Sequence, residues 1–554
     1  MIIAKEKQTA IIKAATDNNF YGKRLRSVKL ELCEQISRDL YGTGQHAANI
    51  CDWLEENRPV KEVAPKQPKA SRPLVDLPVE AGTLEDSTSR WPVLAGKCFI
   101  LTSAQNNTTP HVNFLESLKK YAEFRNGTLL ISKFLYNKNG FQNGEGQKGI
   151  KFNEALEPYF IEENVFLNNR SFAFMAELNI IPTATYPLSG FAEIIGQYSA
   201  AVGHAQITAE NVPALKGQQV RRLFSTGTVT QRNYIQQKAG QKAEGLHCFG
   251  ALLVEFAEDG TFFTRQLQAM DSTGQFYDLN YKITPQGVET TSGHIAALQY
   301  GDIHAEKADE DCVNASFGSN DSLLDFLRPR YQFVHDVHDF TSRNHHNRMS
   351  GVFLARQYAA GRDKVIDDLR DTGRMLQLME RDYSQTVVVE SNHDLALSRW
   401  LDDPKVKIGQ DPANAKLYHA LNAALYTAIE NKDDTFNMLD YALRKFGGYD
   451  FNATFLVTDQ SFPVAGVEMG MHGDKGINGS RGTPKQFKKL GIKANTGHTH
   501  SASIYGGVYT AGVTGALDMG YNEGASSWSQ THIITYENGQ RTLIDYKNGE
   551  FFAL

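Results

Sequence analysis

The chain has 554 residues, of which 41% are apolar and 10% aromatic, so it can bury the cores of two or three domains and is not intrinsically disordered. Its formal net charge of -6 excludes a strongly basic nucleic-acid-binding protein, so any contact with nucleic acid must come from local basic patches or from metal ions. Five scattered cysteines without a C-x-x-C pair argue against a disulfide framework or a zinc ribbon. We see no signal-peptide pattern and no apolar run of about 18 residues, so we expect a soluble cytoplasmic protein with no membrane partner.

Residues 1–58 are predicted to form a small helical domain. Val28, Leu32 and Ile36 recur at helical spacing, a Gly-Thr-Gly turn follows, and a second short helix carries Cys51 and Leu54. Two helices around a tight turn fit a helix-turn-helix or a small bundle that packs or oligomerises, and both alternatives stay open. The next segment, 59–90, is rich in Pro, Lys and Ser and is predicted to be a linker.

An α/β accessory domain is predicted over residues 91–290. An apolar strand at 97–103 precedes a helix at 111–124 and a second strand at 127–134. The segment 247–267 reads as a β-hairpin that turns at Asp259-Gly260. The pattern of this region assigns no chemistry to it.

Residues 291–554 repeat one arrangement, in which an apolar strand is followed by a polar cluster. The clusters read "GDIH", "HDVHD", "SNHD", "MHGD" and "GHTHS". Because ligands bind beyond the carboxyl ends of strands in open α/β sheets, these clusters can converge although they are far apart in the chain. Helical stretches are predicted at 349–382 and 412–446, and a β-rich tail follows residue 507.

The residue types in these clusters suit a pair of divalent cations. Such a pair needs a carboxylate that bridges both ions, together with neutral nitrogen and oxygen donors. An amide oxygen suits Mn²⁺ or Mg²⁺, and the absence of cysteine from the clusters argues against a structural zinc site. The candidate ligands are Asp302, His304, Asp336, Asn392, His472, His498 and His500, with Asp336 as the candidate bridge.

The motifs resemble, in the same order, those of the calcineurin-like metallophosphoesterase superfamily: D-x-H, G-D-x-x-D, G-N-H-D/E, a lone His and G-H-x-H. The resemblance covers residues 290–554 and implies a β-sandwich flanked by helices. It implies that one ion is held by Asp302, His304, Asp336 and His500, and the other by Asp336, Asn392, His472 and His498.

The same resemblance implies roles for residues beside the ligands. His393 would lie over the substrate, and Asp394 would fix its tautomer. Asp339 is expected to lie just behind the ligands, or to act as an ordinary strand-end cap. Three further histidines, at 338, 345 and 346, are expected to line the site or face solvent. His335 and Ser391 stand where the superfamily pattern has glycine.

The implied reaction is hydrolysis of a phosphate ester by a two-metal-activated hydroxide, with Mn²⁺, or alternatively Mg²⁺, as the cofactor and His393 assisting the leaving group. Basic residues near the motifs favour DNA as the substrate. Arg343 and Arg348 follow the candidate bridge, and Lys475 and Arg481 lie in a Gly-rich loop that continues to Lys485, Lys488 and Lys489. A solvated surface loop is the alternative reading of each segment.

The layout of a helical N-terminal piece, an α/β region and a C-terminal phosphoesterase resembles an early host-DNA-degrading nuclease of tailed bacteriophages. The stretches "GQHAAN…WLEEN" and "FLVTDQSFPVAGVEMGMHGDKG" carry this resemblance. It implies a manganese-dependent DNase that acts on DNA in the host cytoplasm. The alternatives are a metallophosphatase or cyclic-nucleotide phosphodiesterase on a small substrate, and a non-catalytic DNA-binding scaffold with a relic metal site. A homo-oligomer is compatible with the extra domains.

Overall fold

The computed structural model describes residues 5–17, 26–56, 91–136 and 149–552. The chain forms two compact units, Met1–Gly82 and Thr83–Leu554. The linker predicted at 59–90 lies outside the described residues.

The first unit contains three helices, α1 (Lys5–Asp17), α2 (Arg26–Tyr41) and α3 (Ala47–Glu56). Ile11, Ile36 and Leu54, one from each helix, lie in a shared buried core. The predicted turn is present, because Gly42 adopts a positive φ and Thr43 caps the short helix η2 (Gly44–His46) by accepting the N–H of Gln45. The predicted helical character is therefore confirmed, and a role in DNA binding stays a prediction.

The second unit is built on two large sheets. The six-stranded sheet has the order β17 (Ala453–Leu456), β16 (Gln385–Val389), β15 (Tyr331–Val334), β14 (Ile295–Gln299), β23 (Thr531–Tyr536) and β24 (Arg541–Asp545). The eleven-stranded sheet has the order β1 (Val93–Leu94), β4 (Val165–Leu167), β5 (Phe172–Met175), β6 (Ser199–Val202), β8 (Arg221–Gly227), β7 (His204–Val212), β21 (Ser503–Tyr505), β22 (Val508–Thr510), β20 (Ala494–Thr496), β19 (Val467–Glu468) and β18 (Pro463–Val464).

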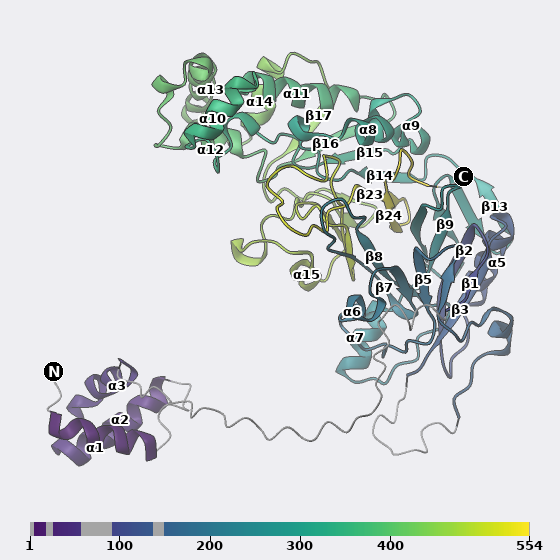
Figure 1. Cartoon of the computed structure of the whole chain (residues 1–554), viewed down its shortest axis with the longest axis horizontal. Helices are drawn as coiled ribbons and strands as arrows, with labels where there is room; N and C mark the ends of the chain where they lie inside the picture. Colours follow the sequence, from purple (N-terminus) through teal and green to yellow (C-terminus); the bar gives the residue numbers. More distant parts are fainter. Residues whose placement is uncertain (1–4, 18–25, 57–90, 137–148, 553–554) are drawn as a thin grey trace, which may run out of the picture. The chain divides into compact units, whose positions relative to one another are not determined.

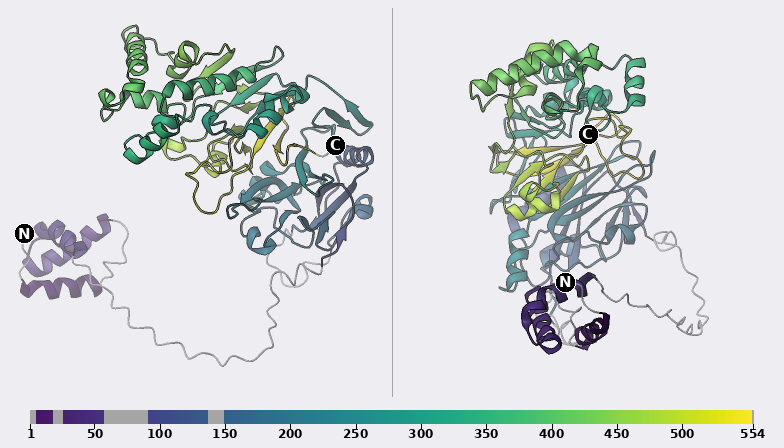
Figure 2. Two further views of the ribbon diagram at one scale, coloured as in Figure 1. Left: turned by 45° about the horizontal axis from the view of Figure 1, so that its top comes forward. Right: turned by 90° about the vertical axis from the view of Figure 1, so that its left-hand side faces the viewer.

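The eleven-stranded sheet is continuous across the boundary predicted between residues 290 and 291. Strand β7 of the middle region pairs antiparallel with β21 of the C-terminal region, through Ala209 with Ile504 and Thr208 with Tyr505. In both views of Figure 2 the C-terminal segment (yellow) lies between the helices (green) and the strands of the middle region (blue). The middle and C-terminal regions therefore share a sheet.

Apolar cores lie on both faces of the six-stranded sheet. One face packs on helices, and Figure 1 shows them along strands β14–β17. The other face packs on β18 and β19, with Phe333, Val387 and Val467 in a common cluster. Burial on both faces explains why these parallel strands read as nearly continuous apolar runs. The helices are α8 (Glu310–Val313), α9 (Leu323–Leu327), α10 (Gly351–Ala359), α11 (Val365–Leu378), α12 (Ala396–Asp402), α13 (Pro412–Glu430) and α14 (Met438–Phe446).

Each of the two long helical stretches predicted in this region is divided in two. The first breaks between α10 and α11, where Gly361 adopts a left-handed φ of 67°, and the second breaks between α13 and α14. Two sheets with covering helices confirm the predicted α/β multidomain class.

The middle region also contains a four-stranded sheet of order β10 (Phe262–Ala269), β9 (Phe249–Phe256), β2 (Cys98–Gln105) and β3 (Thr128–Phe134). Strands β2 and β3 are parallel and are joined through α5 (Val112–Phe124), as the sequence predicts. The predicted hairpin is the antiparallel pair β9 and β10. Three short strands, β11 (Phe276–Asp278), β12 (Tyr281–Thr284) and β13 (Gly287–Thr290), form a further sheet. Among the described helices, none is long and apolar enough to cross a bilayer.

Candidate metal centre

The polar clusters meet because the strands before them end at the same edge. Strands β14, β15 and β16 are parallel neighbours, so the residues after them, Asp302, Asp336 and Asn392, leave the sheet at its carboxyl edge. In the facing sheet, β19 leads to His472, and β20 leads to the "GHTH" segment. The convergence expected from the sequence is therefore present.

Asp336 lies at the centre of this convergence. Its carboxylate is buried, with Oδ2 3.6 Å from His304 Nε2 and Oδ1 3.4 Å from His472 Nε2. Neither oxygen has a hydrogen-bond partner among the described residues. A buried carboxylate with two unpartnered oxygens between two imidazoles costs free energy unless a cation compensates it. The donor set therefore fits a bridging metal ligand.

The first group of candidate ligands surrounds His304. Donor atoms of Asp302, His304, Asp336 and His500 all lie within 4.8 Å of one another. His500 Nε2 lies 2.9 Å from His304 Nε2 and 3.3 Å from Asp302 Oδ2. On the other side of the ring, His304 Nδ1 lies 2.9 Å from Asp339 Oδ1. A carboxylate at one ring nitrogen leaves the other free for a metal, which is the usual arrangement of metal-binding histidines.

The second group surrounds His472. Its Nε2 lies 3.1 Å from Asn392 Oδ1, close to the oxygen of Asp336. The ring centroids of His472 and His498 are 5.2 Å apart. The backbone N–H of His498 donates to Asp302 Oδ2 over 2.7 Å, which links the two groups. The structure thus places the other six candidate ligands around Asp336.

The backbone at this edge is strained. His304, Asp336, His498 and His500 all have positive φ values, of 49°, 45°, 72° and 55°. Residues other than glycine rarely adopt positive φ values, and the residues that do so cluster at functional sites. Gly497 has a different role, because a Cβ there would lie 2.2 Å from Asp302 Oδ1. The glycine of "GHTH" is therefore required by the close approach of the Asp302 carboxylate.

The electrostatics follow from burial and from the neighbouring charges. Burial, and then Asp336, raise the pKa of Asp302 well above its usual value. Burial opposes the ionisation of Asp336, but the nearby histidines outweigh it and hold the pKa of Asp336 below its usual range. Burial lowers the pKa of His472 to about 3, so this imidazole is neutral and able to act as a metal ligand.

His393 lies at the rim of the cluster, and its side chain is 21% exposed. The carboxylate beside its Nδ1 is Asp339, at 3.2 Å, rather than Asp394. Asp394 instead accepts the backbone N–H of His338 and the hydroxyl of Ser391. Burial lowers the pKa of His393, but Asp336 and Asp339 outweigh it and raise the value to about 9. Asp339, rather than Asp394, is thus the carboxylate that lies beside His393.

The basic residues proposed as DNA contacts differ in their surroundings. Arg343 is buried in a bidentate ion pair with Asp411, at 2.7 and 2.8 Å. Arg348 is paired with Asp403. Lys475 and Arg481 are exposed and face each other across the Gly-rich loop. Carboxylates therefore already hold the two arginines after Asp336, whereas the loop residues are accessible.

Several features of the site were not visible in the sequence. The Trp528 ring packs edge-on against His500, with centroids 4.2 Å apart, although it lies far along the chain. Ser391, in place of glycine, accepts the N–H of Asp394 through its hydroxyl. His335 is buried, and neither ring nitrogen has a partner among the described residues.

The additional histidines fall into two groups. His345 and His346 are exposed, which agrees with the expectation that they face solvent. His338 is buried, with Nδ1 2.8 Å from Thr372 Oγ1, so the expectation that it faces solvent is wrong.

The comparisons with known proteins give one close relative. Protein A1 of Escherichia phage T5 is 67% identical to this chain over 558 residues, and the alignment covers 100% of both chains. No protein-family model matches the chain, and no solved structure matches it. The name of the relative states no activity.

Proposed function

The chain belongs to the family of Protein A1 of Escherichia phage T5, and on that premise we propose that it is a metal-dependent nuclease that hydrolyses phosphodiester bonds of DNA in the infected cell. The observation that carries the proposal is the Asp336 carboxylate, which lies between two groups of imidazole and oxygen donors. Neither of its oxygens has a hydrogen-bond partner in the part of the chain that the structure describes. That arrangement is typical of a ligand shared by two divalent cations.

The residues divide into ligands and groups that handle protons. Asp302, His304, Asp336 and His500 would hold one ion, and Asp336, Asn392, His472 and His498 the other. When bound, such ions acidify a water molecule and neutralise phosphate oxygens. Oxygen and imidazole donors without a thiolate favour Mn²⁺ or Mg²⁺.

His393 has the position of a general acid. It is a partly exposed histidine at the rim, and Asp339 Oδ1 lies 3.2 Å from its Nδ1, so Nε2 is directed away from that carboxylate and can reach a substrate. We assign to it the protonation or stabilisation of the leaving oxygen. Asp339 also orients His304, so a single buried carboxylate positions both a ligand and the proton donor.

The proposal is tested with supercoiled and linear plasmid, in Mn²⁺ and in EDTA. We expect the wild-type protein to degrade DNA in Mn²⁺ only, and His393→Gln to slow the reaction by about 10²–10⁴ because a general acid contributes that factor. The exposed His419 in α13 provides a matched control, His419→Gln, which should keep full activity.

The same assay separates the alternatives. Hydrolysis of an aryl phosphodiester without hydrolysis of DNA would replace the nuclease with a phosphodiesterase of small substrates. Binding of Mn²⁺ without hydrolysis of either substrate would leave a non-catalytic scaffold.

A further inference from the structure

A cavity of about 750 Å³ opens between the middle region and the C-terminal strands, and its lining is cationic. Helix α7 (Lys238–Leu246), the segment before β20, and β24 contribute to it. Its volume is in the range of ligand pockets. The charged residues of the lining are all basic: Lys242, Lys485, Lys488, Lys489, Lys493 and Arg541. We call this the basic cavity.

The structure shows no carboxylate partner for these cations within the residues that it describes. Among the described residues, none of the six forms an ion pair with an acidic side chain. Arg541 is only 4% exposed. It donates to the carbonyl oxygens of Ala494 and Gly507, and its Cζ lies 4.1 Å from the ring centroid of Tyr509. Burial lowers its pKa to about 10. A buried guanidinium without an acid is costly, so an anionic ligand would compensate it.

The neighbouring lysines repel one another and lie beside aromatic rings. Burial, and then Arg541, lower the pKa of Lys493, and burial, and then Lys242, lower that of Lys488. Lys485 Nζ lies 5.4 Å from the ring centroid of Tyr186 and 5.0 Å from that of Tyr505. Tyr186 is 41% exposed and offers a face for base stacking. Unpaired cations next to an exposed aromatic ring are the features of a surface that binds single-stranded nucleic acid.

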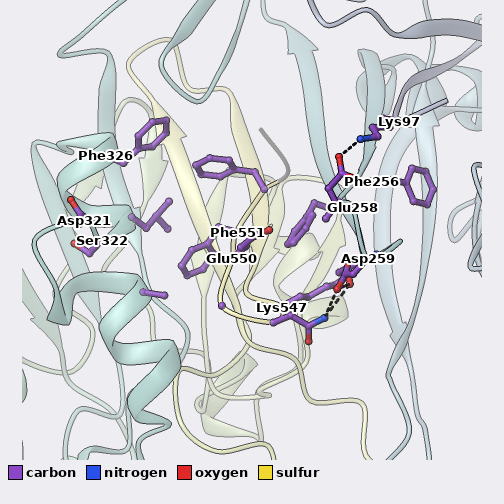
Figure 3. A pocket seen from close by; sticks show the side chains of 18 residues that line it. Lys97, Phe256, Glu258, Asp259, Asp321, Ser322, Phe326, Lys547, Glu550 and Phe551 are labelled. Atoms are coloured by element: carbon purple, nitrogen blue, oxygen red, sulfur yellow. Dashed lines mark hydrogen bonds and ion pairs between the residues drawn. The ribbon is translucent and has the colours of Figure 1, made fainter.

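Two other cavities differ from the basic cavity in the charge of their linings. One cavity, of about 730 Å³, is lined by both acidic and basic residues. Figure 3 shows Lys97 paired with Glu258 in it, and Asp259, Asp321 and Glu550 also line it. A cavity of about 330 Å³ beside His472 is lined by four acidic residues and one lysine. Neither lining has the excess of basic residues that lines the basic cavity. The cavity beside His472 and the basic cavity share Ile492 in their linings, so the two adjoin.

We infer that the basic cavity binds the phosphate backbone of a DNA strand at a distance from the metal cluster. The inference rests on the proposed function for its choice of substrate. Lys493 precedes β20 and His498 follows it, so the two Cα atoms are at most about 17 Å apart at 3.4 Å per residue. At a rise of about 3.4 Å per nucleotide, a strand of at most roughly five nucleotides would connect the two sites.

The test is binding in EDTA, where no hydrolysis occurs, of a labelled single-stranded oligonucleotide long enough to span both sites. Lys485→Glu/Lys489→Glu reverses two exposed charges of the basic cavity, and Lys416→Glu/Lys445→Glu reverses two exposed charges on α13 and α14 as the matched control. We expect the cavity variant to bind at least about tenfold more weakly and the control to bind like wild type. Lys485→Gln/Lys489→Gln should reduce the slope of log K against log salt by about 1.4, because two phosphate contacts are lost.

Activity provides a second readout. Hydrolysis of DNA by the cavity variant should show a raised KM, while hydrolysis of an aryl phosphodiester, which is too short to reach the cavity, should be unchanged. Equal DNA binding by the cavity and control variants would overturn the inference. Tight binding of ATP at the cavity, with no effect of the variant on DNA, would overturn it in favour of a nucleotide site. Because binding is measured in EDTA, it tests the cavity even if the protein hydrolyses no DNA.

Discussion

Replacing Asp336 with asparagine is the sharpest test of the metal centre. The side chain is 1% exposed and lies 3.6 Å from His304 Nε2 and 3.4 Å from His472 Nε2. Asp336→Asn keeps the size of the side chain but removes its charge and one ligand oxygen. Because both groups of donors share this carboxylate, the substitution weakens the binding of both ions.

The magnitude follows from linkage. Loss of an outer-shell partner alone lowers metal affinity by about 10–100-fold, so we expect at least about 100-fold for the shared ligand. At a Mn²⁺ concentration 100 times the wild-type Kd, the ion stabilises the wild-type protein by about 2.7 kcal/mol. If the Kd of the variant is 100-fold higher, the same Mn²⁺ concentration equals that Kd. The ion then stabilises the variant by only about 0.4 kcal/mol.

Two measurements check this expectation: the Kd for Mn²⁺ by titration calorimetry, and urea unfolding with and without Mn²⁺. Asp450→Asn changes an exposed carboxylate and should bind Mn²⁺ like wild type. The reasoning would be refuted if Asp336→Asn bound Mn²⁺ with wild-type affinity and gained the full stabilisation.

Two further predictions concern groups away from the metal centre. Burial lowers the pKa of His204 from 6.5 to about 4, and its Nδ1 accepts the N–H of Gln206, so protonation is disfavoured in the folded protein. Below pH 6.5 the unfolded chain therefore binds more protons than the folded protein, and about 3 kcal/mol of the free energy of unfolding is lost as the pH falls from 6.5 through 4. His204→Gln should flatten this part of the pH dependence measured by urea unfolding. An unchanged pH profile would contradict the attribution of this loss to His204. Arg265 is buried, donates to Asp278 over 2.6 and 2.9 Å, and also pairs with Glu255. Arg265→Met leaves these buried carboxylates without their cation, so it should lower the free energy of unfolding in denaturant by about 3–5 kcal/mol. Lys97→Met, which breaks an exposed pair with Glu258, is the control that should leave stability unchanged, and equal effects of the two substitutions would refute the burial argument.

The sequence by itself determined the local elements and the identity of the candidate ligands. Apolar runs such as "QTVVV" predicted buried strands, and the polar clusters after them named the residues that the structure brings around Asp336. This succeeded because strand patterning is local, and because parallel strands end at a common edge whatever their separation in the chain.

Only the tertiary structure decided which side chains are partners. It places Asp339 rather than Asp394 beside His393, and it holds Arg343 in an ion pair with Asp411. It also joins the middle and C-terminal regions through β7 and β21, and so brings Lys242 and Arg541 to one cavity. Charge pairing and sheet continuation depend on distances between residues far apart in the chain, and neither composition nor periodicity encodes those distances.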